Sequence, residues 1–167
     1  MKKILILTAV CFITVVTMAQ NPLKKGEIQL NAGIGLGSFG TPVYVGLEYG
    51  INKDISLAGD VSYQSKDYGY AKQTAIGVSI KGNYHFNRIL NIDKKWDFYA
   101  GAGLNYYNFN NKFSGSNTNY SFDLNSGVGF DAQVGGRYFF SDNFGVNLEF
   151  GGGSYLSGAR LGITYKF

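Results

Sequence analysis

The chain has 167 residues, a length that suits one domain, and its formal net charge is +4. Its 24 glycines, 13 tyrosines and 13 phenylalanines favour an all-β protein, and its single cysteine excludes internal disulfides and thiolate metal sites. Lysine and arginine form no basic stripe, so the charge pattern of a nucleic-acid-binding protein is missing.

The first segment, 1–19, has the features of a secretory signal peptide. Two lysines precede an apolar run at 4–18, and the small residue Ala19 provides a cleavage position. The apolar run is shorter than the ~20 residues that a membrane-spanning helix needs. Cys11 lies inside this run and is interpreted as an apolar residue of the leader. We therefore expect a signal peptide at 1–19 and one exported domain at 20–167.

Later in the chain, apolar residues alternate with polar residues or glycine in eight segments. Such alternation is typical of strands with one apolar face, and segments of roughly ten residues can cross a bilayer at a tilt. We expect strands at 28–36, 43–51, 55–63, 76–86, 96–106, 128–140, 144–151 and 160–167. The connections alternate between two tight ones at 52–54 and 141–143 with a moderate one at 87–95, and looser polar ones at 37–42, 65–72, 108–120 and 152–157.

Short turns at one end and longer loops at the other are the layout of a membrane barrel. Closing the sheet leaves no unpaired strand edge in lipid. The predicted fold class is therefore all-β, an eight-stranded antiparallel up-and-down transmembrane β-barrel.

The charged residues of the predicted strands all fall on the polar face. Lysine or arginine at the lipid midplane costs about 2–4 kcal/mol, so this face is expected to line the lumen. Charges in a narrow lumen must pair, and the last hairpin places Glu149 opposite Arg160. The alternative is that these charges line an ion path. The predicted lumen charge network is Glu48, Asp60, Lys81, Asp97, Asp131, Arg137, Glu149 and Arg160.

Aromatic residues on the apolar face gather near the strand ends, as expected for rings at a membrane interface. One predicted belt lies at the short-turn end, and Tyr63 and Tyr106 lie near the opposite end. The short-turn belt comprises Tyr49, Tyr84, Phe86, Trp96, Phe98, Tyr138, Phe140, Phe144 and Tyr165, with Phe167 beside it.

Two features could suggest chemistry. The run 35–40 fits the spacing G-x-G-x-x-G, but it leads into a strand and not into the helix that a dinucleotide site requires. His85, the only histidine, is expected in the lumen near the short-turn end, with no evident serine and acid partner. We interpret it as a structural residue and expect no catalytic residues, no cofactor and no metal.

The last residues, 160–167, alternate strictly and end on the aromatic Phe167. Together with the signal peptide, the strand at 99–104 and the strand and turn at 135–143, this ending resembles the small outer-membrane β-barrel family typified by outer-membrane proteins A and X. The resemblance implies a bacterial outer-membrane location and contact with outer-membrane lipid and lipopolysaccharide. It also implies that Phe167 is an assembly signal for the barrel-assembly machinery.

The expected function is a non-enzymatic one, either in envelope structure or in surface interaction through the longer loops. The loop at 108–120 is either a solvated connector or a contact for partners. We expect a monomer that binds no nucleic acid. One alternative is a narrow pore for ions or small solutes, and a second is an enzyme acting on outer-leaflet lipid.

Overall fold

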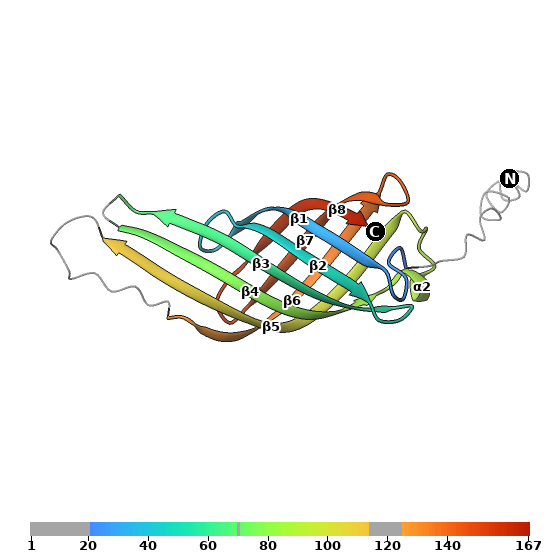
Figure 1. Cartoon of the computed structure of the whole chain (residues 1–167), viewed down its shortest axis with the longest axis horizontal. Helices are drawn as coiled ribbons and strands as arrows, with labels where there is room; N and C mark the ends of the chain where they lie inside the picture. The colour runs from blue at the N-terminus through green and yellow to red at the C-terminus, as the bar shows by residue number, and fades with distance from the viewer. Residues whose placement is uncertain (1–20, 70, 114–124) are drawn as a thin grey trace, which may run out of the picture.

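Eight antiparallel strands close into a barrel in which each strand pairs with the next and β8 pairs with β1 (Figure 1). The computed structural model describes residues 21–69, 71–113 and 125–167, so the predicted signal peptide lies outside the described residues. The closed barrel confirms the predicted fold class. The strands are β1 (Ile28–Gly37), β2 (Val43–Gly50), β3 (Ile55–Asp67), β4 (Ala71–His85), β5 (Trp96–Phe113), β6 (Gly127–Phe139), β7 (Phe144–Gly153) and β8 (Ser157–Lys166).

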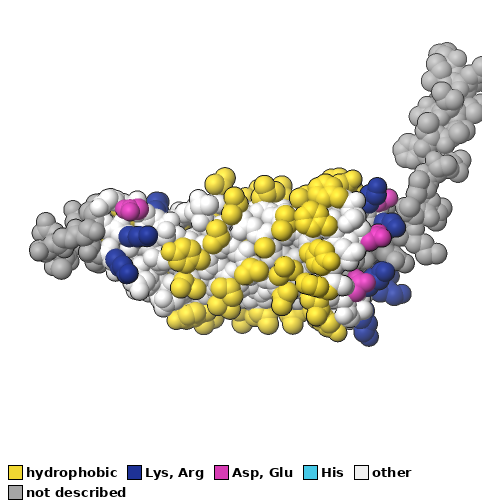
Figure 2. Space-filling model, turned by 45° about the horizontal axis from the view of Figure 1, so that its top comes forward, with side chains coloured by type: hydrophobic (Ala, Val, Ile, Leu, Met, Phe, Trp, Pro, Cys, Tyr) yellow, Lys and Arg dark blue, Asp and Glu magenta, His cyan; other side chains and the backbone are white. Residues whose placement is uncertain are grey.

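The outer wall is apolar because one face of every strand points outward. On the face seen in Figure 2, hydrophobic side chains cover the middle of the barrel, and the visible charged side chains lie at its two ends. Val78, Leu104 and Phe150, for example, are all more than half exposed. Within the described residues, no helix is long and apolar enough to cross a membrane.

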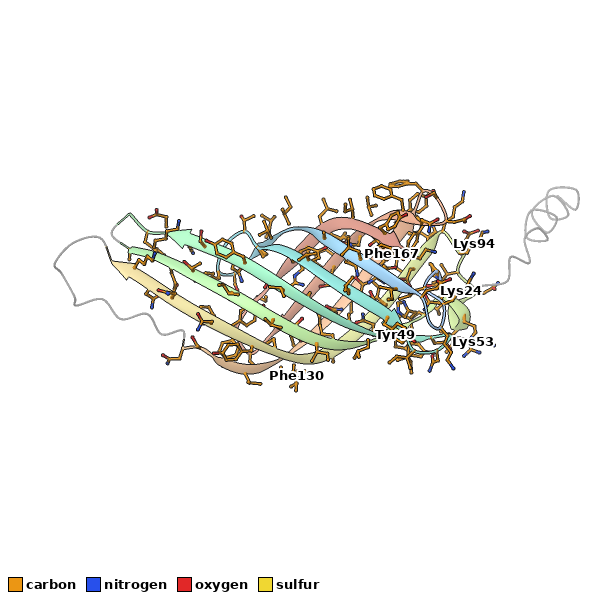
Figure 3. The ribbon with its side chains drawn as sticks, in the orientation of Figure 1. Lys24, Tyr49, Lys53, Lys94, Phe130 and Phe167 are labelled. Atoms are coloured by element: carbon orange, nitrogen blue, oxygen red, sulfur yellow. The ribbon has the colours of Figure 1, made fainter. Side chains whose placement is uncertain are left out.

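Aromatic rings gather near the short-turn end of this wall. Figure 3 shows Tyr49 and Phe167 near that end, with Phe130 farther along the barrel. The Trp96 ring centroid lies 4.7 Å from that of Tyr138. The predicted belt residues are exposed except Phe86 and Tyr138, which are partly buried.

Phe86 corrects one predicted boundary. The strand expected at 76–86 ends at His85, and Phe86 precedes a short helix, α2 (Asn87–Leu90), inside the connection at 87–95. The Phe86 ring still packs edge-on against Tyr84, with centroids 5.2 Å apart. Sequence periodicity does not reveal a single helical turn, because four residues are too few for a helical repeat.

Three strands continue beyond the apolar band, where loops were predicted at 65–72 and 108–120. β3 runs to Asp67, β4 begins at Ala71 and β5 runs to Phe113, whereas β2 and β6 stop pairing near Tyr63 and Tyr107. We call the segments Gln64–Asp67, Ala71–Ala75 and Asn108–Phe113 the projecting sheet. Their outward positions carry exposed polar residues such as Lys72 and Lys112, as expected for a sheet face in water, where apolar alternation is not required.

Residues of two loops and two strands cover the loop end of the lumen. Phe39 from the β1–β2 loop packs with Ala75, Tyr107 and Phe109, and Tyr155 from the β7–β8 loop joins them. The Phe39 and Phe109 rings meet edge-on at 5.8 Å. We call this group the aromatic plug. It buries apolar side chains inside an otherwise polar lumen.

Residues 21–26 cover the opposite, short-turn end. Leu23 is fully buried, and the backbone N–H of Gly26 donates to the Gly50 carbonyl at 2.8 Å. The Lys166 ammonium donates to the Pro22 carbonyl at 2.9 Å. The lumen is therefore covered by protein at both ends.

Two substitutions on one face of β4 test where the lipid band ends. Ile80 lies on the outer wall between Gly59 and Leu104, whereas Thr74 lies on the projecting sheet between Ser65 and Asn110. Ile80→Arg should destabilise the barrel by about 2–4 kcal/mol, because it places a cation in lipid. Thr74→Arg should have a much smaller effect, measured by urea unfolding in vesicles. Equal losses would contradict a projecting sheet in water.

Candidate functional site

A cluster of buried polar side chains lies in the lumen near the short-turn end and is centred on Arg137. One guanidinium nitrogen, Nη1, donates to Asp97 at 2.7 Å, and Nη2 donates to Glu48 at 2.5 Å. Arg137 is 3% exposed, Glu48 is 1% exposed and Asp97 is fully buried. The register explains part of this geometry, because Asp97 and Arg137 face each other directly across β5 and β6. We call these residues, with His85 and Ser56, the Arg137 cluster.

Uncharged neighbours complete the cluster. The Asn83 amide donates to Glu48 at 2.9 Å, and the Arg137 guanidinium carbon lies 4.0 Å from the centre of the Tyr99 ring. The Tyr99 ring has room at this position because it packs over Gly135. A Cβ added at Gly135 would meet the Tyr99 ring at 2.4 Å. Sequence reasoning missed Asn83 and Tyr99, although both occupy the lumen-facing positions of their strands.

His85 has the serine and acid partners that the sequence did not reveal, so that part of the prediction was wrong. Its Nδ1 lies 2.7 Å from Asp97, and its Nε2 lies 2.9 Å from the Ser56 hydroxyl. These contacts resemble a catalytic triad in connectivity. Sequence alone could not find them, because the three residues come from three different strands.

The hydrogen-bond directions argue against nucleophilic chemistry. Ser56 donates its only proton to Glu48, so His85 must donate to the Ser56 oxygen rather than accept from it. A general base would have to accept that proton. Ser56 and His85 are also fully buried, which leaves no room for a substrate. The arrangement fits a structural role for His85.

A second ionic group, the Asp60 cluster, lies toward the loop end. Asp60 accepts from Lys81 at 3.0 Å and from Arg160 at 3.1 Å. Glu149 faces Arg160 directly in the β7–β8 register and lies 3.7 Å from it. Lys81 also donates to the Gln133 side chain at 2.6 Å. The structure thus places Glu149 opposite Arg160, the register expected from the last hairpin.

Asp131 is the one predicted lumen charge outside these two clusters. It forms no ion pair with another described residue, and its Oδ1 is buried without a hydrogen-bond partner in the protein. It lines a cavity of about 60 Å³ together with Lys81 and Arg160. A second cavity of about 30 Å³ lies beside Arg137. Each is large enough for a few water molecules, which can satisfy a buried carboxylate.

The projecting sheet forms a separate polar surface. At its tip, Lys72 lies between Asp67 on β3 and Lys112 on β5. Lys66 lies nearby, with its ammonium 5.2 Å from the centre of the Tyr68 ring. Charged groups at this end of the barrel are visible in Figure 2. Among the described residues, no group of three or more histidine, cysteine or acidic side chains could hold a metal ion.

Comparison with known proteins gives a family match and several structural likenesses. A family model for the outer membrane protein β-barrel domain matches residues 5–167. No curated protein matches the sequence. The fold is similar to that of OprG from Pseudomonas aeruginosa, with 13% identity, 87% of this chain and 97% of that chain covered, and a TM-score of 0.69.

Two further structures share the fold. The N-terminal β-barrel domain of Pseudomonas aeruginosa OprF is 19% identical, with 86% of this chain and 98% of that chain covered and a TM-score of 0.63. Ail, the attachment invasion locus protein of Yersinia pestis, in complex with the heparin analogue sucrose octasulfate, is 12% identical. That comparison covers 86% of this chain and 100% of that chain, with a TM-score of 0.60.

Removing Arg137 tests the Arg137 cluster. Arg137→Ala leaves Glu48 and Asp97 buried without their cation, so it should destabilise the folded barrel by about 3–5 kcal/mol. The control is Arg88→Ala, which breaks the pair of Arg88 with Asp54 and should change stability less, because the Arg88 side chain is largely exposed. Both are measured by urea unfolding in vesicles, with tryptophan fluorescence as the signal. An Arg137 variant as stable as the Arg88 variant would contradict a role for the cluster in stability.

Proposed function

Because the chain belongs to the outer membrane protein β-barrel domain family, we propose that it is a non-enzymatic surface-interaction protein of the bacterial outer membrane. In this proposal the short-turn end faces the periplasm and the projecting sheet faces the outside. The extension of β3, β4 and β5 past the apolar band at one end supports that orientation, because the longer segments of such barrels lie on the outside. The observation that carries the proposal is the projecting sheet, whose strands extend beyond the apolar band.

The chemistry of the projecting sheet favours anionic partners. Among the described residues, Lys66, Lys72 and Lys112 occupy its tip with Asp67 as the neighbouring acid, so the positive charges outnumber the negative one. Ail, which shares the fold, has been crystallised with a sulfated heparin analogue. By analogy, we take the phosphates of lipopolysaccharide or a sulfated glycan as the partner class. Several lysines on one rigid sheet attract such groups through charge, and salt weakens the attraction.

The side chains that fill the lumen favour a sealed barrel rather than a pore. Two clusters of paired charges fill its cross-section, and the aromatic plug and residues 21–26 cover its ends. Two cavities in the lumen, of about 60 and 30 Å³, each have room for a few waters. An ion would have to displace paired, buried side chains to pass, which is costly.

An enzyme acting on outer-leaflet lipid has less support. The histidine with serine and acid neighbours lies at the short-turn end, which in the proposed orientation is far from the outer leaflet. It is also fully buried. Among the described residues, no other histidine is present.

The surface role is tested with a triple variant, Lys66→Gln, Lys72→Gln and Lys112→Gln, in purified folded protein. Its affinity for a heparin oligosaccharide should fall about tenfold or more at low salt, since each lysine contributes to charge attraction. A control variant at the other end, Lys25→Gln with Lys53→Gln, should leave the affinity unchanged. Equal losses, or no binding by the wild-type protein, would overturn the assignment.

The sealed lumen is tested by conductance in planar bilayers. The wild-type protein should show no steady single-channel current. A double variant that keeps charge balance, Arg137→Gln with Glu48→Gln, should raise leakage if the Arg137 cluster is the barrier, provided that its heat-dependent gel shift shows a folded barrel. Steady wild-type channels would instead favour the pore alternative.

A further inference from the structure

A cavity of about 540 Å³ opens at the short-turn end of the barrel. Its walls come from four separate parts of the chain: the segment before β1, the segment before β5, the β6–β7 turn and the end of β8. Figure 3 labels Lys24, Lys94 and Phe167, which all line it. None of the lumen clusters described above contributes to it.

Four lysines line this cavity, namely Lys24, Lys94, Lys95 and Lys166, against two side-chain carboxylates, those of Glu27 and Asp142. The Lys24 ammonium lies 3.9 Å from Glu27 and is largely exposed, so that pair is weak. Lys94 and Lys95 form no ion pair with any carboxylate of the described residues and are exposed. The cavity therefore has a surplus of positive charge.

Another cation at this end of the barrel is already occupied. Arg88 donates to both carboxylate oxygens of Asp54, and this hydrogen bonding lowers the pKa of Asp54 below its ordinary value. Lys53 lies on the β2–β3 turn, outside the cavity lining. The cavity lysines thus differ from Arg88, which is paired with Asp54, and from Lys53, which lies outside the cavity.

One wall of the cavity is aromatic and reaches the lipid face. Phe140 is 61% exposed and Phe167 is 69% exposed, and both belong to the aromatic region of the outer wall. The Phe140 ring neighbours Phe144 at 6.3 Å, and Tyr165 neighbours Phe167 at 5.3 Å. A ligand here would meet ammonium groups on one side and exposed rings on the other.

We propose that this cavity holds the phosphate headgroup of an anionic phospholipid from the periplasmic leaflet. The phosphate would lie among Lys94, Lys95 and Lys24, and the acyl chains would run along Phe140 and Phe167. An ammonium cluster next to an aromatic belt has the charge and polarity that such a lipid requires. The proposal rests on the orientation in the proposed function, because it takes the short-turn end as periplasmic.

The test measures binding of dioctanoyl phosphatidylglycerol to the folded full-length barrel in zwitterionic detergent by isothermal titration calorimetry. We expect saturable binding that falls about tenfold in the double variant Lys94→Gln with Lys95→Gln, since each lysine near a lipid phosphate adds attraction. The matched control, Lys25→Gln with Lys53→Gln, removes two rim lysines outside the cavity and should bind as the wild type does. The heat-dependent gel shift confirms that every variant is folded.

Two further ligands separate the possible sources of the phosphate. Dioctanoyl phosphatidylcholine should bind at least tenfold more weakly, because its headgroup carries no net charge. Inorganic phosphate at equal concentration should not compete. Competition by inorganic phosphate would show that the site binds free anions. Equal losses of affinity in the two double variants would show that the lysines at this end attract lipid without a defined site. Either result overturns the proposal.

The result of the lipid titration is independent of the proposed surface interaction. Binding in detergent has no inside or outside, so a failed titration rejects the lipid site and leaves the heparin experiment unaffected. Conversely, accessibility of a Lys53→Cys label from outside intact cells would reject the orientation while leaving the binding itself intact.

Discussion

The pairing of β8 with β1 is the interaction on which the rest of the structure depends. Inside a bilayer, every backbone N–H and C=O group must be paired within the protein, so an open sheet would expose two unpaired edges to lipid. The seam runs from Gln29 opposite Lys166 to Gly37 opposite Gly158. At Gly33 the backbones approach so closely that an added Cβ would lie 2.2 Å from the Leu161 carbonyl. Closure therefore fixes the register at this seam, and the register fixes which side chains point inward.

Closure also explains why charged side chains form the interior. An eight-stranded barrel is too narrow for a water-filled channel, so inward side chains must pack against one another. Lipid excludes charge from the outer wall, and the polar residues are thereby confined to the lumen. They are stable there only because each cation meets carboxylates from other strands, as Arg137 meets Glu48 and Asp97. The hydrophobic core of a soluble protein is replaced by a network of ion pairs that links distant parts of the chain.

The sequence predicted those parts of the structure that lipid constrains. Alternation located all eight strands and separated inward from outward residues, because a one-residue slip would place charges in lipid. The ends of β3, β4 and β5 were missed, since strands in water need no apolar face. The partners of His85 were missed for another reason: Ser56 and Asp97 lie on different strands, and their contact follows from barrel register, which alternation does not encode. Asp131 shows the opposite limit: it lies on the predicted lumen face but forms no ion pair with another described residue.

The two ends of the barrel are covered in different ways. At the loop end, β3, β4 and β5 extend past the apolar band and the aromatic plug covers the lumen, so the described part of this surface includes a sheet as well as loops. At the short-turn end, the chain before β1 folds back over the lumen and buries Leu23. In the proposed sealed barrel, the lysines around that end surround a covered mouth and not a pore entrance. Their position beside exposed aromatic rings makes the membrane, rather than the lumen, the natural source of a ligand for them.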